Sequence, residues 1–457
     1  MSGAVDTQAP GQIPEFKQVL GHPRPLWMLF MSEFWERFAF YGIRWAMVLY
    51  IVAQFHGGDT SGEKPASELY GAYLALVYAG AIFGGYIADK MIGFQRSILL
   101  GAVFMSVGLF LLAWPNEAMF KLGLATIIVG NGLFKPIIST MVGKLYAQGD
   151  ARRDSGFTIF YMGINIGALL APLVTQYLAK KVFGIEDMPA YKVVFIAAGV
   201  GMLLSLVWFW FGRSQLKGIG LPAAHQTGMR NLSMVLLFGA VIGIPMFYAL
   251  LTIDANLLQM ILMVLIVIPA VMLVVEGVRE GKVARDKVIA MLVIFAFNVL
   301  FWMFFEQAGS SFNFLADRIV NRDIGMEGMF QALAGTNDFP VSWFQSVNSV
   351  AIITLAPLLA WLWVKMGKNN PIIPRKFGLG LIFNGLAFLL LMMALSGMVD
   401  ANGKIPFWTL FMVYVIQSVG ELCLSPIGLS MTTKLAPARL GGLAMGCWFL
   451  SVAIGNN

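Results

Sequence analysis

The sequence predicts an all-α, polytopic membrane protein, and three observations support this fold class. Of the 457 residues, 58% are hydrophobic and only 12% are charged, whereas soluble domains carry about 25% charged residues. Apolar stretches of about 20 residues, the length that crosses the hydrocarbon core as a helix, recur along the chain. The 31 lysines and arginines gather in alternate connecting segments, as the positive-inside rule describes.

Thirteen apolar stretches can be placed, each bounded by polar residues. The predicted spans are 27–53, 69–92, 97–114, 120–144, 155–179, 190–211, 232–252, 255–275, 287–308, 341–364, 377–398, 406–433 and 440–457. Residues 1–26 lack the pattern of a signal peptide, so the first span is expected to direct its own insertion. Most lysines and arginines fall on the side of the N-terminus. We therefore predict a multi-pass protein of the inner cell membrane with a cytoplasmic N-terminus.

The spans form two sets separated by a linker. A cytoplasmic N-terminal segment (1–26) precedes a six-helix bundle (27–211), and a second bundle occupies 287–457. The linker between them (212–286) begins with a polar run, contains two very apolar spans and ends in a charged run. We therefore predict two helix bundles with a two-helix insert between them.

One predicted cytoplasmic loop has a recognisable pattern. The run GGYIADKMIGFQRS, between the second and third spans, contains Asp89, Lys90, Gly93 and Arg96. It resembles the signature loop of the major facilitator superfamily, whose fold joins two six-helix bundles related by an axis along the membrane normal. The charges of Asp89, Lys90 and Arg96 could lock neighbouring helix ends in one conformation, which makes this loop a candidate conformational gate. An ordinary basic loop that obeys the positive-inside rule is the alternative.

A few ionisable residues lie inside the predicted spans, where each costs at least about 2.5–3.5 kcal/mol and marks an ion or substrate pathway. They are Glu33, Glu36, Arg37, Arg44, Lys135, Glu306 and Glu421. Ion pairs that only fix helix packing would explain Glu36 and Arg37. They explain poorly why Lys135, Glu306 and Glu421 lie singly on three separate spans.

The first span places its charges on one face. At about 100° per residue, Arg37 and Arg44 lie within about 40° of Glu33 around the helix, and Glu36 lies about 60° away. Such a face cannot contact lipid tails. It is expected to line a polar cavity.

The first span also carries the clearest family resemblance. EFWERF (33–38), with Tyr41-Gly and Arg44 after it, resembles the ExxERFxYYG element of the proton-dependent oligopeptide transporter family, which belongs to the major facilitator superfamily. Further elements that resemble family motifs are GNGLFKPIIST (130–140), FYMGINIG (160–167), FWMFFEQ (301–307), FQSVNS (344–349) and GELCLSPIG (420–428) with Trp448 after it. The resemblance covers about residues 27–451, and the two-helix insert is similar to that of bacterial members. It implies proton-coupled symport of di- and tripeptides into the cell by alternating access.

Two features depart from the family pattern. Animal members carry a histidine on the second span, whereas His56 of this chain lies in the preceding loop. Proton binding is therefore expected to fall on carboxylates. The family's last helix is absent from the sequence, so the second bundle is expected to be incomplete in this chain.

A short peptide is a zwitterion, and opposite charges on the two bundles could bind its two ends. Arg44 and Lys135 in the first bundle suit the peptide carboxylate, since arginine offers a bidentate fork. Glu421 in the second bundle suits the amino terminus. Asn165 and Asn348 could pair with the peptide amide, because each offers a donor and an acceptor. Three aromatic residues could form tolerant side-chain pockets, although helix packing explains each one alone equally well: Tyr41, Tyr78 and Trp448.

Proton coupling requires carboxylates whose pKa can reach the physiological range, which burial favours. Glu33, Glu36 and Glu306 are the candidates. Protonation of one of them would release its cationic partner, Lys135 or an arginine such as Arg37, to act on the substrate. Which glutamate binds the proton first stays open.

Three other functions fit the sequence less well. A nitrate-type carrier of the same family would lack the intact ExxER run, and a drug–proton antiporter would not need Lys135 and Glu421 in opposing bundles. An enzyme would need a nucleophile–base pair or a metal cluster, which neither the scattered His22, His56 and His225 nor the two cysteines offer. No cofactor is expected besides protons as the coupling ion. The expected partners are di- and tripeptides, protons and the lipid bilayer, with no nucleic acid, and the chain is expected to be a monomer.

Overall fold

The computed structural model confirms an almost entirely helical membrane protein. It describes residues 13–147, 150, 152–184, 189–222, 228–436 and 441–456, so His225 lies outside the described residues. Within them, twelve helices are long and apolar enough to cross a membrane, and one shorter apolar helix, Leu443–Asn456, corresponds to the thirteenth predicted span.

The first half of the chain forms six long helices that pack on one another. They are α1 (Arg24–Phe55), α2 (Glu63–Ile87), α3 (Phe94–Leu112), α4 (Glu117–Gly143), α5 (Arg153–Gln176) and α6 (Tyr191–Gly212). α1 packs against α5 and α6, and α4 packs against α2 and α3. α2 begins earlier than the predicted apolar span, because Glu63 in its first turn suits the positive end of the helix dipole.

Glycines allow some of these helices to approach closely. A Cβ atom on Gly101 of α3 would lie 2.6 Å from the carbonyl oxygen of Gly130 of α4, and one on Gly108 would lie 2.6 Å from that of Gly123. Helices in lipid associate through such close backbone packing, since lipid tails are as apolar as the side chains. The α3–α4 pair therefore depends on these four positions.

A helical hairpin follows the first six helices. α7 (Met229–Phe238) continues through a π-helical turn into α8 (Ile244–Thr252), and α9 (Ala255–Glu280) returns across the membrane. Asp254 between them caps α9, because its carboxylate accepts hydrogen bonds from the backbone of Asn256 and Leu257 at 2.9 and 3.3 Å. α8 packs against α4, whereas α9 packs against α10 and α16. The hairpin thus contacts both halves of the molecule.

Among the described residues, the second half contains four membrane-length spans, the shorter apolar helix α16 and two helices of eight residues, one of which, α11, extends the first span. They are α10 (Lys282–Phe305), α11 (Ser311–Arg318), α12 (Glu327–Ala334), α13 (Trp343–Met366), α14 (Ile373–Gly397), α15 (Phe407–Leu435) and α16 (Gly441–Asn456). α10 ends in a 3-10 turn over Glu306–Gly309, and α11 continues in the same direction. Neither α11 nor α12 was predicted, and neither was the hairpin of β1 (Gln18–Val19) and β2 (His22–Pro23) before α1.

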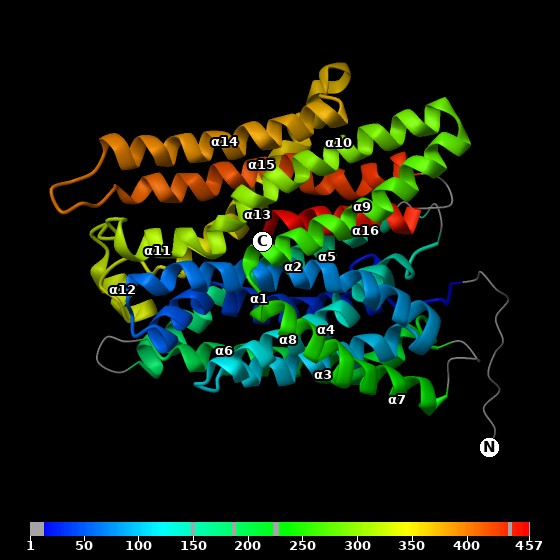
Figure 1. Cartoon of the computed structure of the whole chain (residues 1–457), viewed down its shortest axis with the longest axis horizontal. Helices are drawn as coiled ribbons and strands as arrows, with labels where there is room; N and C mark the ends of the chain where they lie inside the picture. The colour runs from blue at the N-terminus through cyan, green and yellow to red at the C-terminus, as the bar shows by residue number, and fades with distance from the viewer. Residues whose placement is uncertain are drawn as a thin grey trace.

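The two halves lie side by side with their helices roughly parallel (Figure 1). In this view α1, α3, α4 and α6 lie below, and α10, α14 and α15 lie above. The halves meet where α2 packs on α16 and α5 packs on α13, with a smaller contact of α1 with α11. Motion of one half against the other would therefore be felt first along these three contacts.

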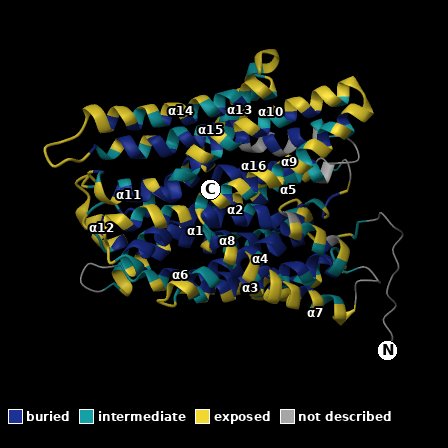
Figure 2. Ribbon diagram, in the orientation of Figure 1, coloured by how far each residue is buried: buried dark blue, intermediate teal, exposed yellow. Residues whose placement is uncertain are grey.

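The outer helices expose apolar side chains, as helices that contact lipid do. The buried residues concentrate on α1, α2 and α4, whereas the outer helices α9 and α14 show exposed faces (Figure 2). Those faces are apolar: Val264, Val267 and Ile268 of α9 are more than half exposed. In a bilayer such side chains would contact lipid tails.

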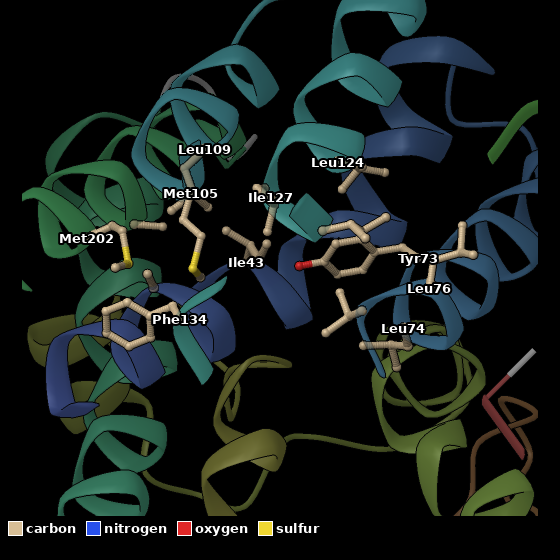
Figure 3. Packing of buried hydrophobic residues seen from close by; sticks show 14 of the residues in the cluster. Ile43, Tyr73, Leu74, Leu76, Met105, Leu109, Leu124, Ile127, Phe134 and Met202 are labelled. Carbon is tan, nitrogen blue, oxygen red and sulfur yellow. The ribbon is translucent and has the colours of Figure 1, made fainter. Parts of the chain in front are cut away.

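The core of the first half draws on all six of its long helices, and residues of α8, α9 and α16 extend it. Figure 3 shows side chains of this buried cluster from α1, α2, α3, α4 and α6, among them Ile43, Tyr73, Leu76, Met105, Ile127, Phe134 and Met202. Among the labelled side chains, Tyr73 carries a polar group, and its buried hydroxyl has no hydrogen-bond partner. This tightly packed core holds α1, and with it the charged face, in a fixed position.

Candidate functional site

A small cavity lies where the two halves meet. Its described lining comes from α1, from the end of α10 and the turn after it, and from α13 and α15: Tyr41, Arg44, Phe305, Ala308, Gln345, Asn348, Tyr414 and Gln417. Its volume of about 10 Å³ has room for about one water molecule. The structure is therefore closed around this point, and a larger molecule could enter only if helices moved.

One ion pair joins the halves at this cavity. Nη2 of Arg44 on α1 lies 2.7 Å from Oε2 of Glu306 in the turn after α10, and both side chains are about nine-tenths buried. The guanidinium also lies 5.7 Å from the ring centre of Tyr41, and its Nε has no hydrogen-bond partner. A buried pair of this kind is costly to break on one side, since the remaining charge is stranded.

A second charged cluster lies within the first half. Arg37 contacts both oxygens of Glu36, and its Nε lies 3.3 Å from Oε1 of Glu33. Asn131 of α4 donates a hydrogen bond to Glu36 at 3.4 Å. The second oxygen of Glu33 is buried without a partner. The predicted charged face of α1 thus divides into one pair that crosses between halves and one cluster that does not.

Lys135 lies between these two groups of charges. Its ammonium is 4.8 Å from the ring centre of Tyr78 and 5.9 Å from that of Phe40. It lies within electrostatic range of Glu33 and Glu306. Among the described residues, Lys135 forms no ion pair within 4 Å. It is thus a buried cation held by aromatic faces, which leaves it able to bind an anion.

Glu421 is positioned from the opposite half. Its Oε2 accepts a hydrogen bond from Nδ2 of Asn348 at 3.0 Å, and the same amide nitrogen also donates to Ser418 at 2.9 Å. Asn348 lines the cavity. The second half therefore presents an oriented carboxylate beside a cavity whose other side holds Arg44.

Asn165 and Trp448 are not among the described residues of the cavity wall. Asn165 is buried and donates a hydrogen bond to the carbonyl of Tyr161 on its own helix. Trp448 is buried against Phe295, in a cluster built by α9, α10, α14, α15 and α16. Both positions suit helix packing, so a contact of either residue with substrate stays a prediction.

The candidate gate loop lies at the ends of α2 and α3. Lys90 is exposed on the π-helical turn Ala88–Ile92, and Arg96 lies in the first turn of α3. The side chain of Asp89 lies outside the part of the chain that the structure describes. Gly93 between them has φ +76°, a conformation that favours glycine. The gating role of the loop stays a prediction.

Three polar residues of the cavity were missed by sequence reasoning. Gln345 precedes Asn348 by three positions, and Tyr414 and Gln417 precede Glu421 by seven and four. These spacings put each on the same helix face as the predicted residue, which is the signal that could have found them. Gln345 and the Tyr414 hydroxyl both donate hydrogen bonds to the carbonyl of Ala308, and so they hold the turn after Glu306.

Two helical halves that enclose a closed cavity with charges from both sides define a membrane transporter. Comparison with known families agrees: the model of the POT family matches residues 95–457. The chain belongs to this family, as its motifs predicted. It is therefore a transporter rather than an enzyme.

Curated relatives and solved structures match over almost the whole chain. The uncharacterized transporter YclF of Bacillus subtilis is 36% identical, with 96% of this chain and 87% of the relative covered. Dipeptide and tripeptide permease B of Salmonella typhimurium is 34% identical, with 95% and 85% covered. The crystal structure of peptide transporter POT in complex with sulfate shares 35% identity at a TM-score of 0.81, covering 97% and 89%. That of a POT family transporter with 5-aminolevulinic acid shares 32%, also at 0.81, covering 97% and 90%.

Proposed function

We propose that this protein imports di- and tripeptides together with protons, by alternating access to one central site. The name of the Salmonella relative, a dipeptide and tripeptide permease, supports the substrate class. The observation that carries the proposal is the ion pair of Arg44 and Glu306, because it joins the two halves at the cavity between them. This ion pair thereby links the protonation of Glu306 to the position of one half relative to the other.

The charges around the cavity match a peptide zwitterion. Arg44 and Lys135, both in the first half, would bind the peptide carboxylate, and Glu421 in the second half would bind the ammonium. Asn348 lines the cavity beside Glu421, so it suits the peptide amide better than Asn165, which is not among the described residues of the cavity wall. A peptide bound at both ends would pull the halves together.

Proton coupling follows from competition for Arg44. While Glu306 is ionised, it occupies the guanidinium that the peptide carboxylate needs. A proton on Glu306 removes its charge and frees Arg44, so proton and peptide bind together. Glu33, Glu36 and Lys135 form a second set of groups through which a proton could pass to the first half.

The distribution of lysine and arginine orients this cycle in the membrane. With the N-terminus in the cytoplasm, the end that carries α11 and α12 would face outward. The protein would lie in the inner membrane and act as a monomer with protons as its coupling ion and no other cofactor.

Uptake by proteoliposomes tests the proposed function. A labelled dipeptide should accumulate above its external concentration when the outside is acidic, and should only equilibrate when the pH is equal. A free amino acid and nitrate, supplied under the same gradient, are the controls for substrate class. Accumulation of nitrate but not of the dipeptide, or dipeptide uptake that ignores the gradient, would contradict the proposal.

A further inference from the structure

A second cavity lies far from the central site, at the ends of α3 and α6. Its volume is about 550 Å³, within the range of small-molecule sites. Arg96 comes from the first turn of α3, and Trp210 and Arg213 come from the end of α6. No acidic side chain occurs among the described lining residues. The cavity is therefore positively charged.

The cavity has a preformed wall. The chain after α6 turns through Lys217 and Gly218, both with positive φ, and runs back over the start of α3. Gln95 holds it there, because its backbone nitrogen donates to the carbonyl of Gly220 at 2.9 Å and its side chain donates to that of Ile219 at 2.8 Å. A ligand would thus meet a shaped site rather than an unordered loop.

The guanidinium of Arg213 is oriented within this wall. It lies 3.7 Å from the ring centre of Trp210, a close stacking contact. Arg213 forms no ion pair with any described acidic residue. Stacking fixes the plane of the guanidinium and leaves its N–H groups available for an oxyanion, which arginine binds in bidentate fashion.

The surroundings distinguish a lipid from a soluble anion. Trp210 and Leu221 of the cavity lining are 50% and 59% exposed, and Phe211, next to Trp210 in the chain, is 76% exposed, so the cavity adjoins exposed apolar side chains. These side chains continue the outward face of α6, a predicted membrane span. Tryptophan is enriched where membrane meets water, and basic pockets between helices on the cytoplasmic side suit anionic headgroups.

We propose that this cavity binds the phosphodiester headgroup of an anionic phospholipid from the cytoplasmic leaflet. Arg213 contacts the phosphate and Arg96 adds positive charge to the cavity, while Trp210 and Leu221 contact the glycerol and the first part of the acyl chains. Gly93 of the candidate gate loop packs against Pro222, another residue of the cavity wall. A bound lipid would therefore hold the loop between α2 and α3 in its present position.

Lipid binding to the purified full chain tests the proposal. Native mass spectrometry in a neutral detergent would follow phosphatidylglycerol, phosphatidylcholine and inorganic phosphate in parallel titrations. Arg213→Gln should weaken phosphatidylglycerol binding about tenfold, the effect of losing a charge-assisted hydrogen bond. Arg279→Gln is the matched control, because its side chain is 73% exposed on the same predicted side and lies outside the cavity. It should bind phosphatidylglycerol like the wild type.

A second variant covers the case in which Arg213→Gln does not fold. Ser214 lines the cavity and is exposed, so Ser214→Asp should be tolerated and should repel the same headgroup. Equal phosphatidylglycerol binding by the wild type and the cavity variants would overturn the proposal. Phosphatidylcholine binding as strong as that of phosphatidylglycerol would also overturn it, because the cavity would then not distinguish an anionic headgroup from a zwitterionic one. Inorganic phosphate that displaces the lipid at equal concentration would assign the cavity to a free anion instead.

Discussion

At the scale of single residues, buried charges near the central cavity keep atoms without partners even where they form an ion pair. Arg44 binds Glu306 but keeps an unpartnered Nε, and Lys135 rests on aromatic faces instead of a carboxylate. Helices that only needed neutral packing would not leave such groups unsatisfied, since each costs free energy when buried. The unsatisfied groups are therefore the expected contacts of a charged substrate.

Blocked dipeptides test these contacts directly. Glu421→Gln should weaken binding of a free dipeptide about ten- to a hundredfold and barely change binding of an N-acetylated one, which has no ammonium. Arg44→Ala should weaken the free and N-acetylated peptides and spare an already weak C-amidated one. Competition binding of all three ligands to each variant is the measurement. Equal losses for all three would mean that Glu421 and Arg44 only hold helices together.

Some of these residues could be predicted from the sequence alone, and others could not. The burial of Arg44, Glu306, Asn348 and Glu421 near the contact of the halves could be predicted, because a charge or amide inside an apolar span needs a polar partner, whereas their roles in binding and coupling stay predictions. Trp448 could not be placed, since an aromatic residue in such a span packs equally well on any face. Which charges of α1 pair across the halves also depends on the fold, because helical angle alone puts them on one face.

At the scale of elements, the break between α10 and α11 is what positions Glu306 between the two halves. Glu306 lies in the 3-10 turn that separates α10 from α11, and its neighbours there are held by Gln345 and Tyr414. Hydropathy predicted the long helices well. It could not predict α11 or α12, because helices of eight residues contain no membrane-length apolar run.

α11 also carries an ion pair that closes one end of the molecule. Nη1 of Arg318 lies 2.6 Å from Glu63 at the start of α2, and both side chains are about one-third exposed. Such a pair contributes about 0.2–1 kcal/mol. Arg318→Ala should therefore raise the population open at this end by at most about fivefold.

Spin labels on α2 and α12 would measure that opening. Cysteines at the exposed positions Glu68 and Glu327 report the distance between the halves by electron paramagnetic resonance. Arg322→Ala is the matched control, since Arg322 binds the carbonyl of Phe339 within its own half. Distance distributions that do not change in Arg318→Ala, or that change equally in both variants, would mean that the ion pair of Arg318 with Glu63 does not keep this end closed.

At the scale of the whole molecule, the two halves meet mainly where α2 packs on α16 and α5 packs on α13, and the α7–α9 hairpin contacts both halves. The composition and the spacing of apolar runs were enough to predict this plan. The contacts of the hairpin with both halves could not be predicted, because all its faces are similarly apolar. Movement between the halves must therefore be accommodated within the hairpin, whose α8 packs on the first half and whose α9 packs on the second.

The orientation in the membrane can be tested independently of transport. Lys64 and Glu280 are exposed at opposite ends of membrane helices, and both native cysteines are buried. A single introduced cysteine at Lys64 should react with a membrane-impermeant maleimide from outside intact cells. One at Glu280 should react only after the membrane is opened. Reaction of both from the same face would overturn the span count.

The central claim is that one carboxyl group couples the proton to the peptide, and Glu306→Gln tests it most directly. Glutamine keeps the shape of the side chain but cannot release a proton, so the variant should lose concentrative dipeptide uptake under an inward proton gradient. Counterflow exchange, which needs no net proton movement, should continue. Glu280→Gln, at an exposed position on α9, should behave like the wild type. If Glu306→Gln concentrates the dipeptide as the wild type does, Glu306 is a structural residue and the proposed coupling is wrong.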